Sequence, residues 1–125
     1  MKYLLTVTAI VEGCAGLMFE VLPSQMSKLV FGTSLSTSIE FALARGFGIG
    51  LIGLAVICWL TRHDGQSHTV RGIVGGLMVF EAGCAIGLLY ANIVSGLSSI
   101  FFWPFVLIHL VMATWCIVCL RKRPD

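Results

Sequence analysis

The sequence is poor in charged residues. Lys, Arg, Asp and Glu make up 11% of the 125 residues, whereas a soluble domain carries about 25%. Hydrophobic residues make up 58% of the chain, so too few polar side chains remain to cover a water-facing surface. This composition excludes a soluble enzyme, a disordered chain and a nucleic-acid-binding protein, and it indicates an integral membrane protein.

The sequence also lacks the alternation of apolar and polar residues that a membrane β-barrel requires. Instead, four continuous apolar runs each approach the roughly 20 residues that a helix needs to cross about 30 Å of hydrocarbon. The runs cover about residues 3–22, 38–60, 70–94 and 101–120. They predict an all-α fold, a four-transmembrane-helix bundle that forms a single integral-membrane domain over residues 1–125. The loop at 23–32 is expected to form a short amphipathic turn at the outer interface, and Thr37 or Ser38 to cap the second helix.

Basic residues are distributed unevenly around the four runs. Lys28 lies alone on one side, and the other six flanking basic residues lie on the opposite side: Lys2, Arg62, Arg71, Arg121, Lys122 and Arg123. Because Lys and Arg next to membrane spans accumulate on the cytoplasmic side, both termini and the loop between the second and third runs are predicted to be cytoplasmic.

Four ionisable residues lie inside the apolar runs. Glu12, Glu81 and His109 fall within about one helical turn of the middle of their runs, and Arg45 lies about one turn outward of the middle of the second run. A charge at the bilayer centre costs about 2.5–3.5 kcal/mol on insertion scales. We therefore expect the four side chains to converge in the bundle interior as a polar centre. There Arg45 would bind one carboxylate, and the other carboxyl group would share a proton with His109.

Two functions are compatible with such a centre. The first is a structural or accessory role, because buried polar networks hold membrane helices together. The second is a small proton-linked carrier or ligand-binding protein, in which Arg45 binds an anion while Glu81 and His109 relay protons. No Ser-His-Asp set, phosphate-binding loop or Glu-x-x-His helix is present, so the chain is not expected to be an enzyme.

Glycines recur at helical spacing in two of the runs. One set shares a face of the second helix, and another shares a face of the third helix, about opposite to Glu81. Small residues at this spacing let membrane helices approach closely, so we expect these faces to pack on a neighbouring helix or on a second copy of the chain. The predicted partners are thus the lipid bilayer, a homodimer partner and an unidentified small molecule. The glycines are Gly46, Gly50 and Gly53 in the second helix, and Gly72, Gly76, Gly83 and Gly87 in the third.

Five cysteines lie within the spans. Their odd number argues against a disulfide framework. Cys116 and Cys119 have the spacing of a redox motif, but they lie at the cytoplasmic end of the fourth run and are expected to be reduced, buried and apolar in character. His63 and His68 are followed by no further ligand at zinc-like spacing, so the sequence predicts no metal and no cofactor.

Short motifs in the second and fourth runs carry a resemblance. Ala42-Leu43-Ala44-Arg45-Gly46-Phe47-Gly48, Cys58-Trp59-Leu60 and Phe102-Trp103-Pro104, followed by His109, resemble a family of small, uncharacterised bacterial four-span membrane proteins. The resemblance implies a bacterial inner-membrane protein and places Arg45 and His109 at family positions, but it implies no activity. Phe80-Glu81 stands where that family has a Tyr-Asn-like pair, so a role of Glu81 would be particular to this chain.

Size, four spans and the carboxyl group of Glu12 are also similar to the small multidrug resistance transporters. That resemblance implies exchange of protons for cations at the carboxylate of Glu12. The biased distribution of basic residues and the presence of Arg45 depart from the pattern of those transporters.

Overall fold

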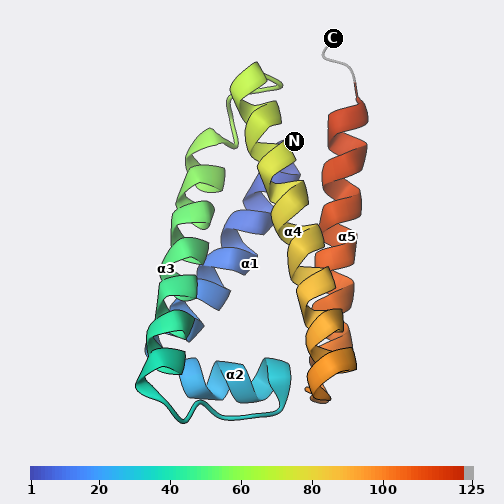
Figure 1. Ribbon diagram of the computed structural model, residues 1–125. Helices are drawn as coiled ribbons and strands as arrows, with labels where there is room; N and C mark the ends of the chain where they lie inside the picture. The colour runs from blue at the N-terminus through green and yellow to red at the C-terminus, as the bar shows by residue number, and fades with distance from the viewer. Residues whose placement is uncertain (123–125) are drawn as a thin grey trace.

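The computed structural model describes residues 1–122, which form five helices joined by short loops and contain no strand (Figure 1). The helices are α1 (Lys2–Val21), α2 (Pro23–Phe31), α3 (Ser38–Thr61), α4 (His68–Ser95) and α5 (Phe102–Arg121). The chain is thus all-α, as predicted. Four of the helices, α1, α3, α4 and α5, are long and apolar enough to cross a membrane.

The helices end where local sequence stops them. Pro23 occupies the first position of α2 and separates it from α1, because proline cannot continue a helix that requires its N–H. Gly32 ends α2 in the left-handed conformation, with φ of 78°, which glycine adopts without a steric penalty. Thr37 caps α3 in a capping box with Glu40: the Thr37 hydroxyl accepts from the Glu40 N–H, and the Glu40 carboxylate accepts from the Thr37 N–H.

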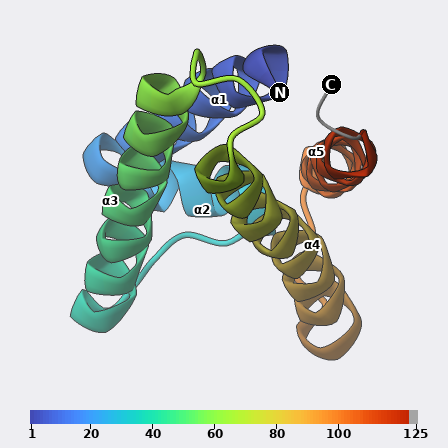
Figure 2. The same cartoon turned by 90° about the horizontal axis from the view of Figure 1, so that it is seen from above.

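The four long helices form two antiparallel pairs. Helix α1 packs along α3, and α4 packs along α5. Helices α3 and α4 diverge toward one end of the molecule, where α2 crosses between the two pairs (Figures 1 and 2). The chain begins near the opposite end, which α5 also reaches at its last residues (Figure 1). The structure is therefore an open bundle whose two halves are joined at the α2 end by that short helix.

The buried apolar side chains form two clusters, one toward each end of the bundle. The first includes Leu5 from the start of α1, Val74 from the start of α4 and Cys116 from the end of α5. The second includes Met26 from α2 and Phe102 from the start of α5. The middle of the bundle, between the two clusters, is where the ionisable residues of α1, α4 and α5 lie.

Close helix packing uses different glycines from those predicted. A Cβ atom on Gly16 of α1 would lie 2.7 Å from the carbonyl oxygen of Gly48 in α3, and one on Gly48 would lie 2.9 Å from the carbonyl oxygen of Gly16. These two glycines allow the backbones of α1 and α3 to touch. Within residues 1–122, a Cβ on any of the seven predicted glycines would meet nothing within 4 Å: Gly46, Gly50, Gly53, Gly72, Gly76, Gly83 and Gly87.

The prediction that those seven glycines pack on a neighbouring helix of the same chain is therefore wrong. Helical spacing identified which glycines share a face, and it placed the glycine face of α4 opposite the buried Glu81, but it did not identify which face of α3 turns inward. Each of the seven has an exposed surface. That the glycine faces of α3 and α4 pack on a second copy of the chain stays a prediction.

Candidate functional site

Three ionisable side chains from three helices meet in the middle of the bundle. Glu12 comes from α1, Glu81 from α4 and His109 from α5, and one nitrogen or oxygen atom of each lies within 4.8 Å of those of the other two. Glu12 is 4% exposed and Glu81 1%, and the side chain of His109 is 18% exposed. These three residues, called the acidic cluster below, connect one helix pair to the other.

The spacing of buried residues along each helix explains why the acidic residues face inward. On α1, Leu5, Thr8, Glu12, Gly16 and Phe19 are all buried and follow one another at intervals of three or four residues. That interval places them on one side of a helix. Glu12 thus occupies the inward face of α1, where an apolar residue would otherwise be expected.

The same spacing positions Glu81. Val74, Leu77, Glu81, Ala85 and Leu88 form the buried face of α4. The apolar residues on either side of Glu81 anchor this face against the rest of the bundle and fix the carboxyl group at mid-depth.

A short hydrogen bond links the two members of the cluster that lie on α4 and α5. His109 Nδ1 lies 2.6 Å from Glu81 Oε2, and it is the only ion-pair contact within residues 1–122. Either the imidazole N–H donates to the carboxylate, or the carboxylic acid donates to the unprotonated nitrogen. In both cases a hydrogen atom lies between the two helices, so the contact can pass a proton from one residue to the other.

The buried side-chain oxygen atoms that lack a hydrogen-bond partner within residues 1–122 include one on the inward face of α4 and one on the inward face of α1. Glu81 Oε1 accepts no hydrogen bond from any of residues 1–122, and neither does the hydroxyl of Thr8, which is fully buried one helical turn from Glu12. Buried polar atoms in proteins are nearly always paired with protein or water. Among residues 1–122, Glu81 Oε1 is therefore free to accept a hydrogen bond or to bind a cation.

Arg45 is not part of the cluster. The polar centre was predicted to include it, but Arg45 is exposed on α3 and makes no ion pair with any of residues 1–122. The prediction used depth alone, and Arg45 has the expected depth but lies on a different face of its helix. It stands seven residues from the start of α3, about 10 Å along the helix axis, so its long side chain can extend to the membrane–water interface.

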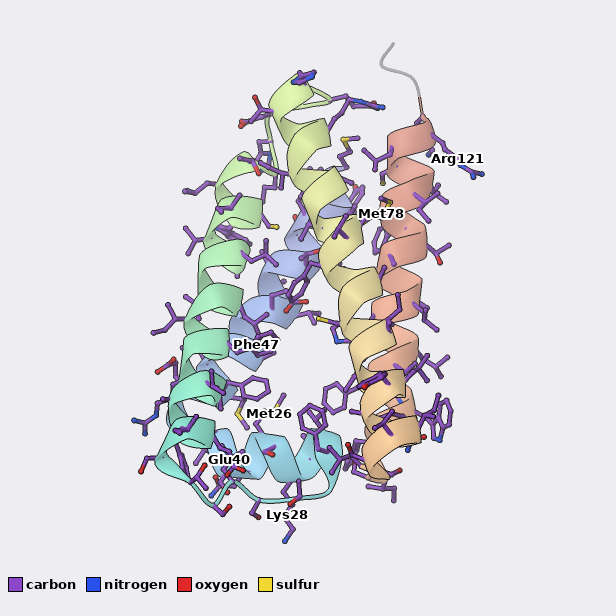
Figure 3. All side chains as sticks on the ribbon, in the orientation of Figure 1. Met26, Lys28, Glu40, Phe47, Met78 and Arg121 are labelled. Carbon is purple, nitrogen blue, oxygen red and sulfur yellow. The ribbon has the colours of Figure 1, made fainter. Side chains whose placement is uncertain are left out.

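An apolar cavity of about 410 Å³ adjoins the cluster and lies between the two helix pairs. Glu12 and His109 are its only charged or basic lining residues, and Cys84 also lines it. Met26 and Val30 line the end of the cavity that lies at α2. Figure 3 shows Met26 and Phe47 pointing into the space between α3 and α4. The cavity thus has an apolar body with one polar region at Glu12 and His109.

Aromatic rings form much of the cavity wall. Phe47 of α3 makes an edge-to-face contact with Phe19 of α1, at 5.3 Å between centroids, and stacks on Phe80 of α4 at 6.4 Å. The stack with Phe80 spans the opening between the two pairs. Sequence reasoning did not find this wall, because phenylalanine at helical spacing in an apolar run is ordinary for any membrane helix, and only the fold brings these three rings together.

The cysteines take no part in a disulfide. All five are free thiols. Cys116 and Cys119 are buried in the apolar cluster near the end of α5, where they pack as small apolar side chains.

No known protein family, curated protein or solved structure matches this chain. Its function is therefore inferred from the geometry of the acidic cluster and the cavity.

Proposed function

We propose that this multi-pass membrane protein binds a small, largely apolar molecule between its two helix pairs, and that binding is linked to a proton at the acidic cluster. One observation carries the proposal: a cavity of about 410 Å³ walled by apolar side chains has Glu12 and His109 as its charged or basic groups. Ligand sites in proteins typically combine an apolar pocket with a few convergent polar groups. The ligand would place its hydrogen-bonding end group at Glu12 and His109 and its apolar body among the phenylalanine rings.

The proton link follows from the chemistry of the cluster. His109 lines the cavity and shares a hydrogen atom with Glu81, while Glu12 lies beside both. A ligand group that hydrogen-bonds to Glu12 or His109 competes with the contacts inside the cluster, and it thereby changes which of the three residues holds a proton. Arg45 does not line the cavity, so binding of an anion by its guanidinium is not part of this proposal.

Photolabelling tests the proposal. The probe is octanol that carries a photoreactive diazirine, because it combines a hydroxyl end with an apolar chain that the cavity can hold. In protein reconstituted into lipid nanodiscs, we expect label on cavity-lining residues and protection by unlabelled octanol. Gly87→Phe is expected to fill the cavity and reduce labelling about tenfold, equivalent to about 1.4 kcal/mol of binding free energy.

Gly83→Phe is the matched control. Gly83 and Gly87 lie one turn apart on α4, and a Cβ on either meets nothing within 4 Å of residues 1–122, but only Gly87 lines the cavity. The labelling of wild type should change with pH, and Glu12→Gln should abolish that change. Label spread evenly over the lipid-facing residues, or equal labelling of both glycine variants, would overturn the proposal.

A structural role is the second candidate, and the position of the cluster favours it. Glu12 belongs to the α1–α3 pair, whereas Glu81 and His109 belong to the α4–α5 pair. If the cluster serves only to hold the pairs together, its variants should lose stability in detergent while photolabelling of the remaining folded protein keeps its pattern and its pH dependence.

We further propose that the protein lies in a bacterial inner membrane with both termini in the cytoplasm. The bacterial assignment rests on the sequence resemblance alone. The orientation is supported by charge: Lys28 of α2 and Arg121 of α5 lie at opposite ends of the bundle (Figure 3), and Arg62 and Arg71 flank the loop at the Arg121 end. Arg123, which was counted with this basic group, lies outside the described residues. A C-terminal reporter active only in the cytoplasm tests the orientation, and an active periplasmic reporter would reverse it.

A further inference from the structure

Glu12, Glu81 and His109 also have the composition of a metal site. They offer two carboxylate oxygens and one imidazole nitrogen, all within 4.8 Å of one another. Carboxylate and imidazole donors together suit Zn²⁺ and similar divalent transition metals. Mg²⁺ and Ca²⁺ prefer six or more oxygen ligands and are poorly matched to this donor set.

The surroundings of the cluster strengthen this interpretation. Two carboxylates in apolar surroundings are costly as anions unless a cation accompanies them, and Arg45 does not lie beside them. Glu81 is 1% exposed and its Oε1 atom is unpaired among residues 1–122. A divalent cation would balance two carboxylates and give this oxygen a partner.

We propose that Glu12, Glu81 and His109 bind one divalent transition-metal ion, for which Zn²⁺ is the best-matched candidate. The ion replaces this hydrogen bond by binding His109 Nδ1 and the unpaired Oε1 of Glu81, and the hydrogen atom between Nδ1 and Oε2 moves to the other ring nitrogen or leaves as a proton. Three protein ligands leave one position of a tetrahedral ion free. Because Glu12 and His109 line the cavity, a water or a small molecule can occupy that position. This site does not require the apolar ligand proposed above.

The sequence alone predicted no metal because the three ligands come from three different helices. Each ligand lies on a separate span, and successive members are 69 and 28 positions apart in the sequence, so no short motif marks them. Their common depth indicates that they can meet, and the structure shows that they do meet.

Metal analysis of the purified full-length protein tests this proposal. After treatment with a chelator, the protein is titrated with Zn²⁺ and with Co²⁺. Elemental mass spectrometry measures the amount of bound metal, and visible absorption reports the coordination of bound Co²⁺. We expect one ion per chain and the absorption of a tetrahedral cobalt site. Glu81→Gln and His109→Gln should each lower the metal affinity at least about 100-fold. Loss of a residue that only hydrogen-bonds to a metal ligand lowers affinity by up to about 100-fold, and loss of a ligand itself should lower it at least as much.

Two control variants separate this site from other donors. Glu20→Gln removes an acidic residue two turns further along α1, and His63→Gln removes an exposed histidine from the loop before α4. Both should bind metal as the wild type does. Loss of metal in His63→Gln together with normal binding in Glu81→Gln would overturn the proposal, because the metal would then belong to the exposed loop.

His109→Cys guards against a variant that simply fails to fold. A thiolate at this position is a good ligand for Zn²⁺ and Co²⁺, so this variant should gain a sulfur-to-cobalt charge-transfer band. Leu110→Cys, whose side chain belongs to the next position on α5 and is exposed, should not. Metal should also raise the melting temperature of the wild type but not of Glu81→Gln. Equal cobalt spectra for both cysteine variants, or no bound metal in folded wild type, would refute the site.

Discussion

Replacing both members of the His109–Glu81 contact with apolar residues shows whether the contact exists for stability. The single variant His109→Leu leaves Glu81, which is 1% exposed, with neither oxygen paired. Breaking one side of a buried ion pair typically costs about 3–5 kcal/mol. Glu81→Leu leaves only the imidazole, which is 18% exposed and borders the cavity, so a loss of about 1–3 kcal/mol is expected, the usual range for an unpaired polar group.

The double variant Glu81→Leu/His109→Leu should differ from wild type by no more than about 1 kcal/mol. Apolar residues of similar volume replace buried ion pairs with little loss and sometimes with a gain in stability. The coupling energy from the double-mutant cycle should therefore exceed about 2 kcal/mol, more than the average of about 0.6 kcal/mol for interhelical hydrogen bonds in membranes. Unfolding in mixed micelles with increasing denaturing detergent measures all four proteins.

A near-neutral double variant that has lost ligand or metal binding would assign the contact to function. If instead the double variant loses about as much stability as His109→Leu alone, the coupling energy is still favourable and the contact is a net source of stability. The structural role would then be the correct one.

Three further outcomes follow from contacts elsewhere in the bundle. Gly16→Ala should destabilise the protein by about 1–3 kcal/mol, because its Cβ would lie 2.7 Å from a backbone oxygen of α3. Gly46→Ala should be neutral in the same detergent unfolding assay, because its Cβ would meet no atom of residues 1–122 within 4 Å. Thr37→Ala removes the hydroxyl that accepts from the Glu40 N–H and should cost about 0.5–2 kcal/mol, and recovery of that loss by Thr37→Ser would show that the cap is responsible. Arg71→Ala removes the guanidinium that donates to the carbonyl oxygens of Leu120 and Lys122. It should speed amide hydrogen exchange in the last turn of α5 but not in α3, and unchanged exchange in α5 would contradict this contact.

The spans could be predicted from the sequence because their length and composition are set by the thickness of the bilayer. The run predicted at 38–60 is the helix Ser38–Thr61, and the run predicted at 70–94 is the helix His68–Ser95. The amphipathic segment predicted at 23–32 is the helix Pro23–Phe31. Hydropathy reports where a helix enters and leaves an apolar phase, and this information is local to each run.

The rotation of α3 about its own axis could not be predicted in the same way, whereas the ionisable residues of α1 and α4 did indicate which face of those helices turns inward. Arg45 and Glu12 are placed at similar depths by residue counting, yet Glu12 is buried and Arg45 is exposed. Rotation is set by contacts between helices, such as the close approach of Gly16 to Gly48, and those contacts depend on two runs at once. Gly16 does follow Glu12 by one helical turn, so the inward face of α1 carried a signal, whereas the glycines of α3 lie on more than one face.

The position of the acidic cluster gives binding a consequence for the whole bundle. Helices α3 and α4 diverge toward the α2 end (Figure 1), and contacts between the two pairs in mid-membrane include the cluster and the Phe47–Phe80 stack. A metal ion bound by Glu12, Glu81 and His109 ties α1 to α4 and α5, whereas an apolar ligand occupies the space between the same pairs. Each occupant interacts with both halves of the bundle. It therefore favours the spacing between the halves to which it binds more tightly, by an amount set by the difference between its affinities for the two spacings.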